Sequence, residues 1–245
     1  KKYSVFLIFP KGFVENLFLL FSQQKKADKD GSISQRRNNM SAYVSTKKQM
    51  SMQTIAKISM LGALACVLMM FEIPLPIAPP FYKIDFSEVV VLIGGFAMGP
   101  WAAVAIEGLK VVLNLLLNGT ITMGVGEFAN FLIGCALVVP ATVFYQHEKT
   151  KKNALIGLIM GTIIMTLVGA LVNYFILVPA YAYFMSPAIT MEIIIGMGAA
   201  IFPNIHGLLG LVLLCVVPFN IIKGVLVSSI VFVHISEVAP LLKRS

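Results

Sequence analysis

The chain of 245 residues is 58% hydrophobic and only 12% charged, with a formal net charge of +8 at pH 7. Soluble domains carry about 25% charged residues, so this chain has too few polar side chains to cover a globular surface in water. The composition excludes a cytosolic enzyme, a nucleic-acid-binding domain and a disordered chain, and it predicts a protein that lies in a lipid bilayer.

Positive charge is concentrated in the first fifty residues, which hold ten Lys and Arg against three acidic residues. The remaining residues are nearly balanced in charge. Cys66, Cys135 and Cys215 lie far apart in apolar runs. Because there is no CxxC motif or Cys/His ligand spacing, they predict neither a disulfide framework nor a zinc site. We interpret them as small hydrophobic residues of helices.

Residues 1–39 differ from the rest of the chain. Phe13–Phe21 is apolar but much shorter than the roughly 20 residues that a spanning helix needs, and Asp28–Asn39 is polar. The sequence begins without Met, and the residues before Met40 resemble a translated ribosome-binding sequence. We therefore expect the natural start at Met40 and a non-native or disordered extension over 1–39. An amphipathic surface anchor is the alternative.

From Met52 onward, apolar runs are separated by Pro, Gly and charged residues. They predict six transmembrane helices with short loops, over residues 55–71, 86–98, 101–117, 125–145, 154–178 and 219–235. The four prolines of Ile73–Pro80 exclude a helix there. Residues 180–203 are expected to form a partly helical connection, and a seventh short segment within Ile205–Val217 is an alternative. The predicted fold class is an all-α membrane protein with one six-helix domain over residues 40–245.

Basic residues predict the orientation of this domain. With six spans, they fall on one side of the membrane: Lys47, Lys48, Lys57, Lys149, Lys151, Lys152, Lys243 and Arg244. Cytoplasmic loops are enriched in Lys and Arg, so both termini are expected in the cytoplasm. Any pocket built from the opposite loops would then face outward.

Common catalytic motifs are missing from the sequence. There is no GxxxxGK[ST] phosphate-binding loop, no GxSxG and no HExxH. The histidines at positions 147, 206 and 234 are isolated, and His234 with Glu237 is expected to be a solvated pair. The chain itself is therefore not expected to hydrolyse ATP.

Polar residues inside or beside the apolar runs are the candidates for a functional site. Phe81–Glu88 carries three charges and three aromatic rings; Asp85 or Ser87 could cap the next helix, or the segment could cover a pocket. Glu107 and Lys110 are three residues apart within a span, where ionisable residues are costly. They could neutralise each other as a structural pair or act in function.

Two further stretches suggest a ligand more directly. Glu127 and Asn130 lie three residues apart on one face after the glycines of Gly124–Gly126; helix packing explains the glycines but not this polar pair. Asn173 lies within the fifth predicted span, where it could bind a neighbouring helix or a ligand.

The segment after Pro218 gives the sharpest signal, since Asn220 and Lys223 share one helical face. A lysine near a helix start is disfavoured by the helix dipole, so Lys223 needs an acceptor; a structural partner such as Glu107 is the alternative to a ligand. Amides with one ammonium group suit a flat, neutral heterocycle rich in acceptors. A phosphorylated ligand would call for Arg, and residues 51–243 contain none.

Three blocks of the sequence resemble the S components of energy-coupling factor (ECF) vitamin transporters. The resemblance is nearest to the riboflavin-specific, RibU-type S components and covers about residues 52–243. The blocks are Tyr82–Val89 with Leu92–Phe96, Gly124–Gly134, and Val217–Gly224. The resemblance implies six helices and an outward vitamin site beneath the first loop. It also implies a complex with a transmembrane coupling (T) subunit and two cytoplasmic ATPases.

The resemblance also implies roles for individual residues. The riboflavin ring would contact Asn173, Asn220 and Lys223, with Tyr82 contributed by the first loop. To these we add Glu127 and Asn130 as substrate-binding candidates. Small residues on the first span form the family's docking surface. Here the register departs from the usual AxxxA, and the candidates are Ser59, Gly62, Ala63 and Cys66.

The predicted function is high-affinity riboflavin binding for uptake across the bacterial plasma membrane, as the multi-pass subunit of an ATP-driven ECF transporter. Riboflavin would be the transported ligand, and no cofactor, metal or nucleic acid is expected. One alternative is an S component for another neutral vitamin. The other is a membrane-embedded enzyme that uses Glu107, Lys110 and Glu127 as acid and base.

Overall fold

The computed structural model describes residues 52–120, 123–185 and 188–242, and for 236–242 it describes only the helix backbone. The described residues belong to one unit, Met50–Ser245. The predictions for residues 1–39 and Met40 lie outside them, as do Lys47, Lys48, Lys243 and Arg244. The predicted pair with Glu237 also lies outside; the ring nitrogen Nδ1 of His234 instead lies 2.8 Å from the carbonyl oxygen of Ile230.

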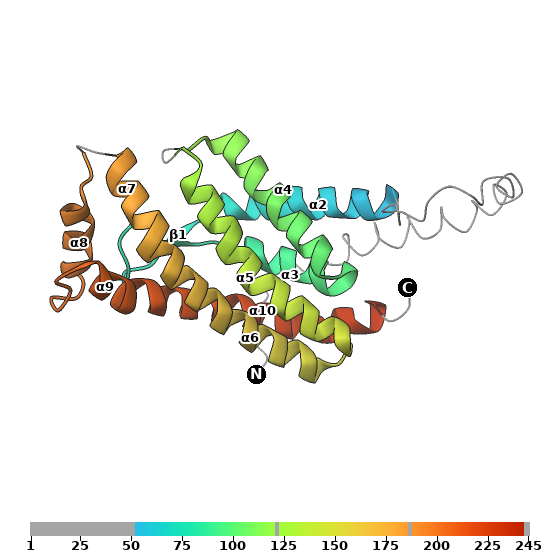
Figure 1. Ribbon diagram of the computed structural model, residues 1–245. Helices are drawn as coiled ribbons and strands as arrows, with labels where there is room; N and C mark the ends of the chain where they lie inside the picture. Colours follow the sequence, from blue (N-terminus) through green and yellow to red (C-terminus); the bar gives the residue numbers. More distant parts are fainter. Residues whose placement is uncertain (1–51, 121–122, 186–187, 243–245) are drawn as a thin grey trace, which may run out of the picture. The chain divides into compact units, whose positions relative to one another are not determined.

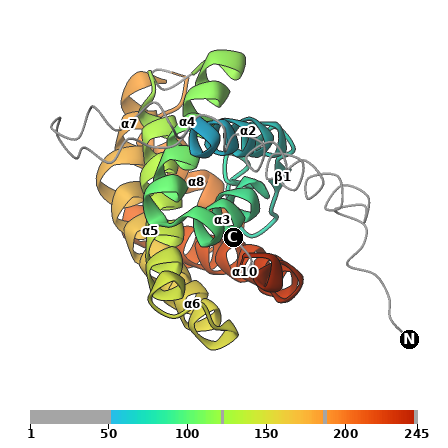
Figure 2. The same ribbon diagram turned by 90° about the vertical axis from the view of Figure 1, so that its right-hand side faces the viewer.

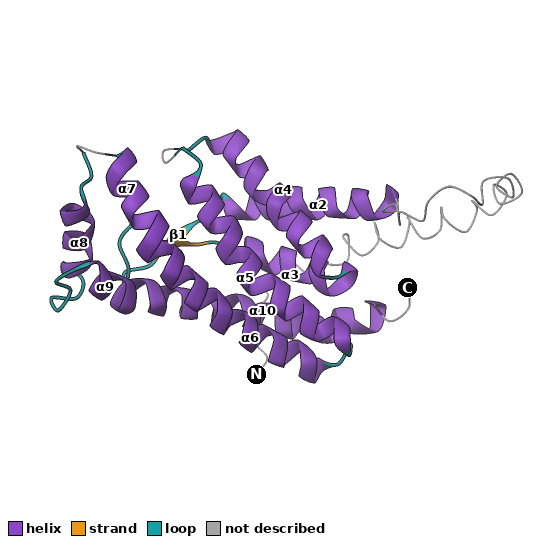
Figure 3. Cartoon of the chain, in the orientation of Figure 1, coloured by secondary structure: helices purple, strands orange, loops and turns teal. Residues whose placement is uncertain are grey.

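Helices make up most of the described chain (Figures 1 and 3). Two of the long helices contain a π-helical segment, η2 or η3, in which each turn holds an extra residue. In chain order the elements are α2 Met52–Met69, α3 Ser87–Met98, α4 Pro100–Asn118, α5 Val125–His147, α6 Lys151–Val172, η2 Asn173–Leu177, α7 Val178–Phe184, α8 Met191–Ala199, α9 Leu208–Leu211, η3 Val212–Val216 and α10 Val217–Leu242.

The proline-rich connection between α2 and α3 is not helical, as predicted, but it contains a small antiparallel pair of strands that the sequence did not predict. β1, Ile73–Pro74, pairs with β2, Lys83–Ile84. An ion pair beside the strands joins Nζ of Lys83 to Oε2 of Glu72 at 2.7 Å. We refer to residues 72–86 as the α2–α3 connection.

The six predicted apolar segments all correspond to helices, but only five helices in the described residues are long and apolar enough to cross a membrane. The exception is α3, whose 12 residues extend only about 18 Å at 1.5 Å per residue. A bilayer's hydrocarbon core is about 30 Å thick. The predicted count of six full spans is therefore not confirmed, and the side of the membrane on which the termini lie remains a prediction.

Two predicted helix boundaries at proline were wrong. The fifth segment was expected to end before Pro179 and the sixth to begin after Pro218, but the helices continue through both prolines as Lys151–Phe184 and Leu208–Ile235. Each π segment ends two residues before its proline. Because a proline has no N–H to donate to the preceding turn, the wider turn can precede it without losing a further hydrogen bond. Residues 208–217 thus join the last helix instead of forming a seventh segment.

Close helix packing builds the main apolar core, which joins α2, α3, α4, α5, α6 and α10. Figure 2, a view along the bundle, shows α6 beside α5 and α10. Gly157 and Gly161 of α6 permit this approach, because a Cβ at Gly157 would lie 2.6 Å from the carbonyl oxygen of Ala141 and one at Gly161 would collide with that of Leu137. A second apolar cluster joins the α2–α3 connection to α7, α8, α9 and η3.

Candidate functional site

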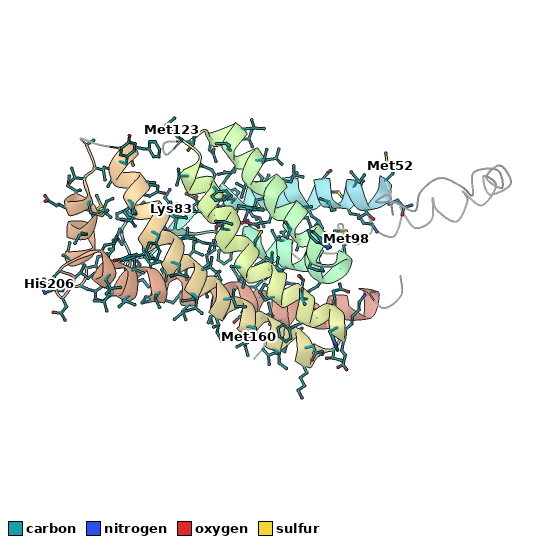
Figure 4. The ribbon with its side chains drawn as sticks, in the orientation of Figure 1. Met52, Lys83, Met98, Met123, Met160 and His206 are labelled. Atoms are coloured by element: carbon teal, nitrogen blue, oxygen red, sulfur yellow. The ribbon has the colours of Figure 1, made fainter. Side chains whose placement is uncertain are left out.

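A cavity of about 240 Å³ lies where the α2–α3 connection meets the helices. Lys83 of that connection is labelled in Figure 4. All six predicted substrate-binding residues line this cavity, although they come from four separate parts of the chain. The lining consists of Met69, Glu72, Phe81, Tyr82, Lys83, Asp85, Asn114, Gly126, Glu127, Ala129, Asn130, Ile133, Asn173, Leu177, Tyr181, Phe219, Asn220 and Lys223.

The two buried asparagines of the cavity are held by their own helices. Nδ2 of Asn173 donates to the carbonyl oxygen of Gly169 at 2.8 Å, and Nδ2 of Asn220 donates to that of Val216 at 2.9 Å. Gly169 also leaves room for the second amide, because a Cβ there would lie 2.9 Å from Nδ2 of Asn220. Among the described residues nothing donates to Oδ1 of Asn220, so this acceptor is open to a ligand.

Tyr82 fastens the α2–α3 connection to the helix that carries Asn173. Its hydroxyl donates to Oδ1 of Asn173 at 2.6 Å. Burial raises the pKa of this hydroxyl above its usual value, so Tyr82 is a proton donor at neutral pH. The sequence analysis left a neighbouring helix or a ligand open as the partner of Asn173, whereas the partner observed is Tyr82 of the non-helical α2–α3 connection.

Lys223 is paired with Asp85, not with the predicted partner Glu107. Nζ of Lys223 lies 3.0 Å from Oδ2 of Asp85. Oδ1 of the same carboxylate accepts the backbone N–H of Ser87 at 2.9 Å and also contacts the Ser87 hydroxyl. Burial raises the pKa of Asp85, but Lys223, Lys110 and the hydrogen bond from Ser87 lower it by more, so the pKa lies below its usual value.

Both interpretations of Phe81–Glu88 therefore hold in part. Asp85 satisfies a free N–H at the start of α3, as a capping residue would, although Phe86 occupies the cap position itself. Phe81, Tyr82, Lys83 and Asp85 also line the cavity.

Glu107 and Lys110 form the predicted structural pair, with Nζ of Lys110 2.7 Å from Oε1 of Glu107. The sequence did not predict that Glu88 joins them, its Oε1 lying 3.0 Å from Nζ of Lys110. Glu88, Glu107 and Lys110 are buried, and none of them lines the cavity.

Aromatic rings form one wall of the cavity; the sequence analysis included Phe81 and Tyr82 among its candidates but missed Tyr181 and Phe219. The ring centroid of Phe81 lies 4.5 Å from that of Tyr82 and 5.6 Å from that of Tyr181, and Tyr82 lies 5.5 Å from Phe219. Phe219 adjoins Asn220 in the sequence, which was an available signal. Tyr181 lies eight residues after Asn173, close to two helical turns, but the assumed helix end at Pro179 concealed this relation.

The polar residues at the solvent side of the cavity are less buried. Thr120 donates to Oε2 of Glu127 at 3.0 Å, and Nδ2 of Asn130 lies 3.9 Å from the sulfur of Met69. Glu72 and Lys83 are partly exposed and paired. Three acidic and two basic side chains line the cavity in all, and four of these five are in ion pairs with each other.

The predicted docking residues of α2 divide between two faces. Ser59 and Ala63 are exposed, but Gly62 and Cys66 are buried within the bundle. A Cβ at Gly62 would lie 2.6 Å from Cδ2 of Leu109 in α4. The prediction for Gly62 and Cys66 is corrected accordingly, since their small size serves packing between α2 and α4.

The helix bundle and its cavity match a known class of membrane protein. Residues 53–235 match the family model of the ECF transporter, substrate-specific component. The chain belongs to this family, as its three sequence blocks predicted, and it is a multi-pass protein of the bacterial cell membrane.

Individual relatives narrow the comparison. The chain is 34% identical over 203 residues to the riboflavin transporter RibU of Staphylococcus aureus (strain TCH60), covering 81% of this chain and 98% of that protein. It is 31% identical over 191 residues to the riboflavin transporter FmnP of Bacillus subtilis (strain 168), covering 76% and 93%. A solved S component of a bacterial ECF transporter is similar with a TM-score of 0.60 and 34% identity, over 78% of this chain and 98% of that one.

Proposed function

We propose that this chain is the riboflavin-binding subunit of an ATP-driven ECF transporter and that it mediates riboflavin uptake. One observation carries the proposal: Asn173, Asn220 and Lys223 line a single cavity with Tyr82, in a chain whose relatives are named riboflavin transporters.

The chemistry of the cavity suits a flavin ring. The ring of riboflavin is flat and neutral, and its imide edge presents both acceptors and an N–H. The open Oδ1 of Asn220 can accept that N–H, while the ammonium of Lys223 can donate to a ring carbonyl. The rings of Phe81, Tyr181 and Phe219 offer an apolar surface for stacking.

The charges of the cavity favour a neutral ligand. Lys83 is paired with Glu72 and Lys223 with Asp85, so no arginine and no unpaired lysine lines the cavity in the described residues. Another neutral vitamin would meet the same conditions, and only a binding measurement separates it from riboflavin.

A membrane-embedded enzyme is not favoured by the geometry. Glu107 and Lys110, two of its three proposed acid and base groups, are fully buried and outside the cavity. An acid or base must lie within hydrogen-bond reach of its substrate.

The proposed orientation places both termini in the cytoplasm and the cavity on the outer side. The start of α5, including Glu127, lines the cavity, and the basic residues Lys149, Lys151 and Lys152 follow the other end of this helix. The positive-inside rule places these lysines in the cytoplasm, which leaves the cavity facing outward.

Energy coupling would come from partner proteins, namely the T subunit and two ATPases. We propose that the T subunit docks on the exposed face of α2 at Ser59 and Ala63, where small side chains permit close helix approach. We also propose that residues 1–39 are dispensable, so that a chain beginning at Met40 inserts, binds and transports normally.

The test is a spectrum and a titration of the chain purified without partners. We expect a flavin absorption spectrum from co-purified riboflavin, and saturable quenching of riboflavin fluorescence after the ligand is removed. Titration with other neutral vitamins is the control. A colourless protein that fails to quench riboflavin fluorescence, or one that prefers another vitamin, contradicts the proposal.

A further inference from the structure

A cluster of buried ionisable side chains lies behind the floor of the cavity, where α3, α4, α10 and the α2–α3 connection meet. We call it the charge cluster; its members are Asp85, Glu88, Glu107, Lys110 and Lys223, each at most 7% exposed. The ion pairs run from Asp85 to Lys223 at 3.0 Å, from Lys223 to Glu88 at 3.9 Å, from Glu88 to Lys110 at 3.0 Å and from Lys110 to Glu107 at 2.7 Å. Only Asp85 and Lys223 face the cavity.

The charges of this cluster do not balance. Three carboxyl groups face two ammonium groups, so the fully ionised cluster would carry one net negative charge. An uncompensated ion inside a low-dielectric interior costs several kcal/mol, and such a group takes up or releases a proton instead. Among the described residues, the titratable side chains that interact with the cluster from outside it include the thiols of Cys66 and Cys135, which supply no positive charge.

Unsatisfied oxygens show where the imbalance lies. Among the described residues, Oε2 of Glu88 and both carboxyl oxygens of Glu107 have no hydrogen-bond partner, although Oε1 of Glu107 lies 2.7 Å from Nζ of Lys110 in an ion pair. Oε1 of Glu88 faces two ammonium groups, and Asp85 has Lys223 and the N–H of Ser87. Glu107 has one ammonium neighbour, Lys110, which it shares with Glu88, and its carboxyl group also lies against that of Glu88.

The surroundings of Glu107 also favour a neutral group. Its carboxyl lies against Gly134 of α5, where any Cβ would collide with Oε1. Thus α5 presents bare backbone there, and no charged side chain from α5 compensates the carboxylate. In the described residues, no group of three or more His, Cys, Asp or Glu is arranged to hold a metal ion, which leaves a proton as the ligand.

We propose that Glu107 is a proton-binding site: its carboxyl group stays protonated in the folded protein and makes the charge cluster neutral. The proton keeps a net negative charge from lying behind the cavity floor, and so leaves Lys223 to interact with Asp85 and with a ligand. This proposal goes beyond vitamin binding and does not depend on which vitamin is bound.

Infrared difference spectroscopy of the purified protein tests the proposal, because a protonated carboxyl group has a carbonyl stretch that a carboxylate lacks. We expect such a band in the wild-type protein and its loss in Glu107→Gln. Asp85→Asn should also remove it, because the two remaining carboxylates then balance the two ammonium groups. Glu192→Gln, which changes an exposed carboxylate of α8, is the matched control and should leave the band in place.

The position of the proton is tested with substitutions that keep the carboxyl group. Glu107→Asp should shift the band, and Glu88→Asp should leave its frequency unchanged. Circular dichroism and size-exclusion chromatography confirm that each variant is folded, and Gln at 107 has the shape of the protonated acid. No difference band between wild type and Glu107→Gln overturns the proposal, as does a band that survives in Asp85→Asn. A shift in Glu88→Asp alone assigns the proton to Glu88 and also overturns it.

Discussion

The two ends of the helix bundle are held together by different interactions. At the end away from the cavity, α5 and α6 meet through Gly157 and Gly161, and apolar side chains pack there against backbone. At the cavity end, buried polar groups join elements far apart in the chain: Tyr82 and Asn173 are 91 residues apart, and Asp85 and Lys223 are 138 apart.

This difference determines how each end responds to substitution. Removal of one buried methylene group from an apolar side chain costs about 1 kcal/mol of stability and leaves the neighbouring side chains packed. A polar pair is different, because removing one partner leaves the other buried without a hydrogen bond or counter-charge. At the cavity end, therefore, binding and folding stability depend on the same residues.

The largest expected effect comes from a substitution on a third region, the exposed face of α2, which should abolish uptake without changing binding at the cavity. Ala63 is exposed and lies six residues, about 9 Å along the helix, from Met69, which lines the cavity. Ala63→Trp should abolish riboflavin uptake by cells that contain the T subunit and the ATPases, while equilibrium binding stays unchanged. Leu167→Trp, at an exposed apolar position of α6, is the control for bulk. If Ala63→Trp still takes up riboflavin, the T subunit docks on a surface other than this face of α2.

Lys223→Met should affect both binding and stability. It removes a ligand donor and leaves Asp85 buried without its counter-charge, which typically costs about 3–5 kcal/mol of stability. Riboflavin affinity should fall by about a hundredfold or more. The double variant with Asp85→Asn should recover thermal stability but not binding, and Lys152→Met, at an exposed position, should change neither. Full binding by the double variant would show that Lys223 is structural.

Asn220→Leu should separate binding from stability more cleanly. Its amide bonds only to the carbonyl of Val216 in the described residues, so folding loses little. A ligand group left without its partner costs about 1–3 kcal/mol, or roughly ten- to a hundredfold in affinity. Fluorescence titration measures the change, with Asn204→Leu as the exposed control. Wild-type affinity in Asn220→Leu would remove this residue from the site.

Gly169→Ala should disturb the site by steric pressure alone. The new Cβ would lie 2.9 Å from Nδ2 of Asn220, and such overpacking costs about 1–3 kcal/mol. We expect riboflavin affinity to fall by about tenfold. Gly196→Ala is the matched control, since a Cβ there meets nothing within 4 Å. Equal affinity in the two variants would show that the Asn220 amide moves freely.

The smallest effect concerns pH. Since the pKa of Asp85 is lower in the folded chain than its usual value, the folded state favours the carboxylate and gains stability above the unfolded value of about 4. This contribution is lost as pH falls below that value toward the folded one. The thermal unfolding temperature of the protein should therefore fall only at acidic pH. In Asp85→Asn this fall should be smaller. An unaltered acid profile in Asp85→Asn would contradict it.

Much of the site could be predicted because polar residues stand out in apolar runs. Asn173, Asn220 and Lys223 were identified in this way, and the family blocks added Tyr82. The partner of Lys223 could not be predicted, because Asp85, Glu88 and Glu107 all offer carboxylates and only the packing of α3 against α10 decides among them. Tyr181 and Phe219 were missed because aromatic residues are common in such helices.

The fold was predicted in its order of helices but not at its irregular points. Apolar runs indicate where a helix lies, whereas the length of the run decides whether the helix can span the bilayer. The run that forms α3, residues 86–98, is short in the sequence itself. Pro179 and Pro218 were given their usual weight as helix breakers. The π segments before them could not be foreseen from composition, because an added residue in a turn leaves the apolar pattern almost unchanged.

These π segments change the angular phase of the helices that carry the cavity. Each residue of an α-helix turns the chain by about 100°, so one extra residue in η3 rotates everything after it relative to an uninterrupted helix. Asn220 and Lys223 of α10 follow η3 in the chain and line the cavity. A single-residue deletion within Val212–Val216 would turn both side chains away from the cavity without altering either of them.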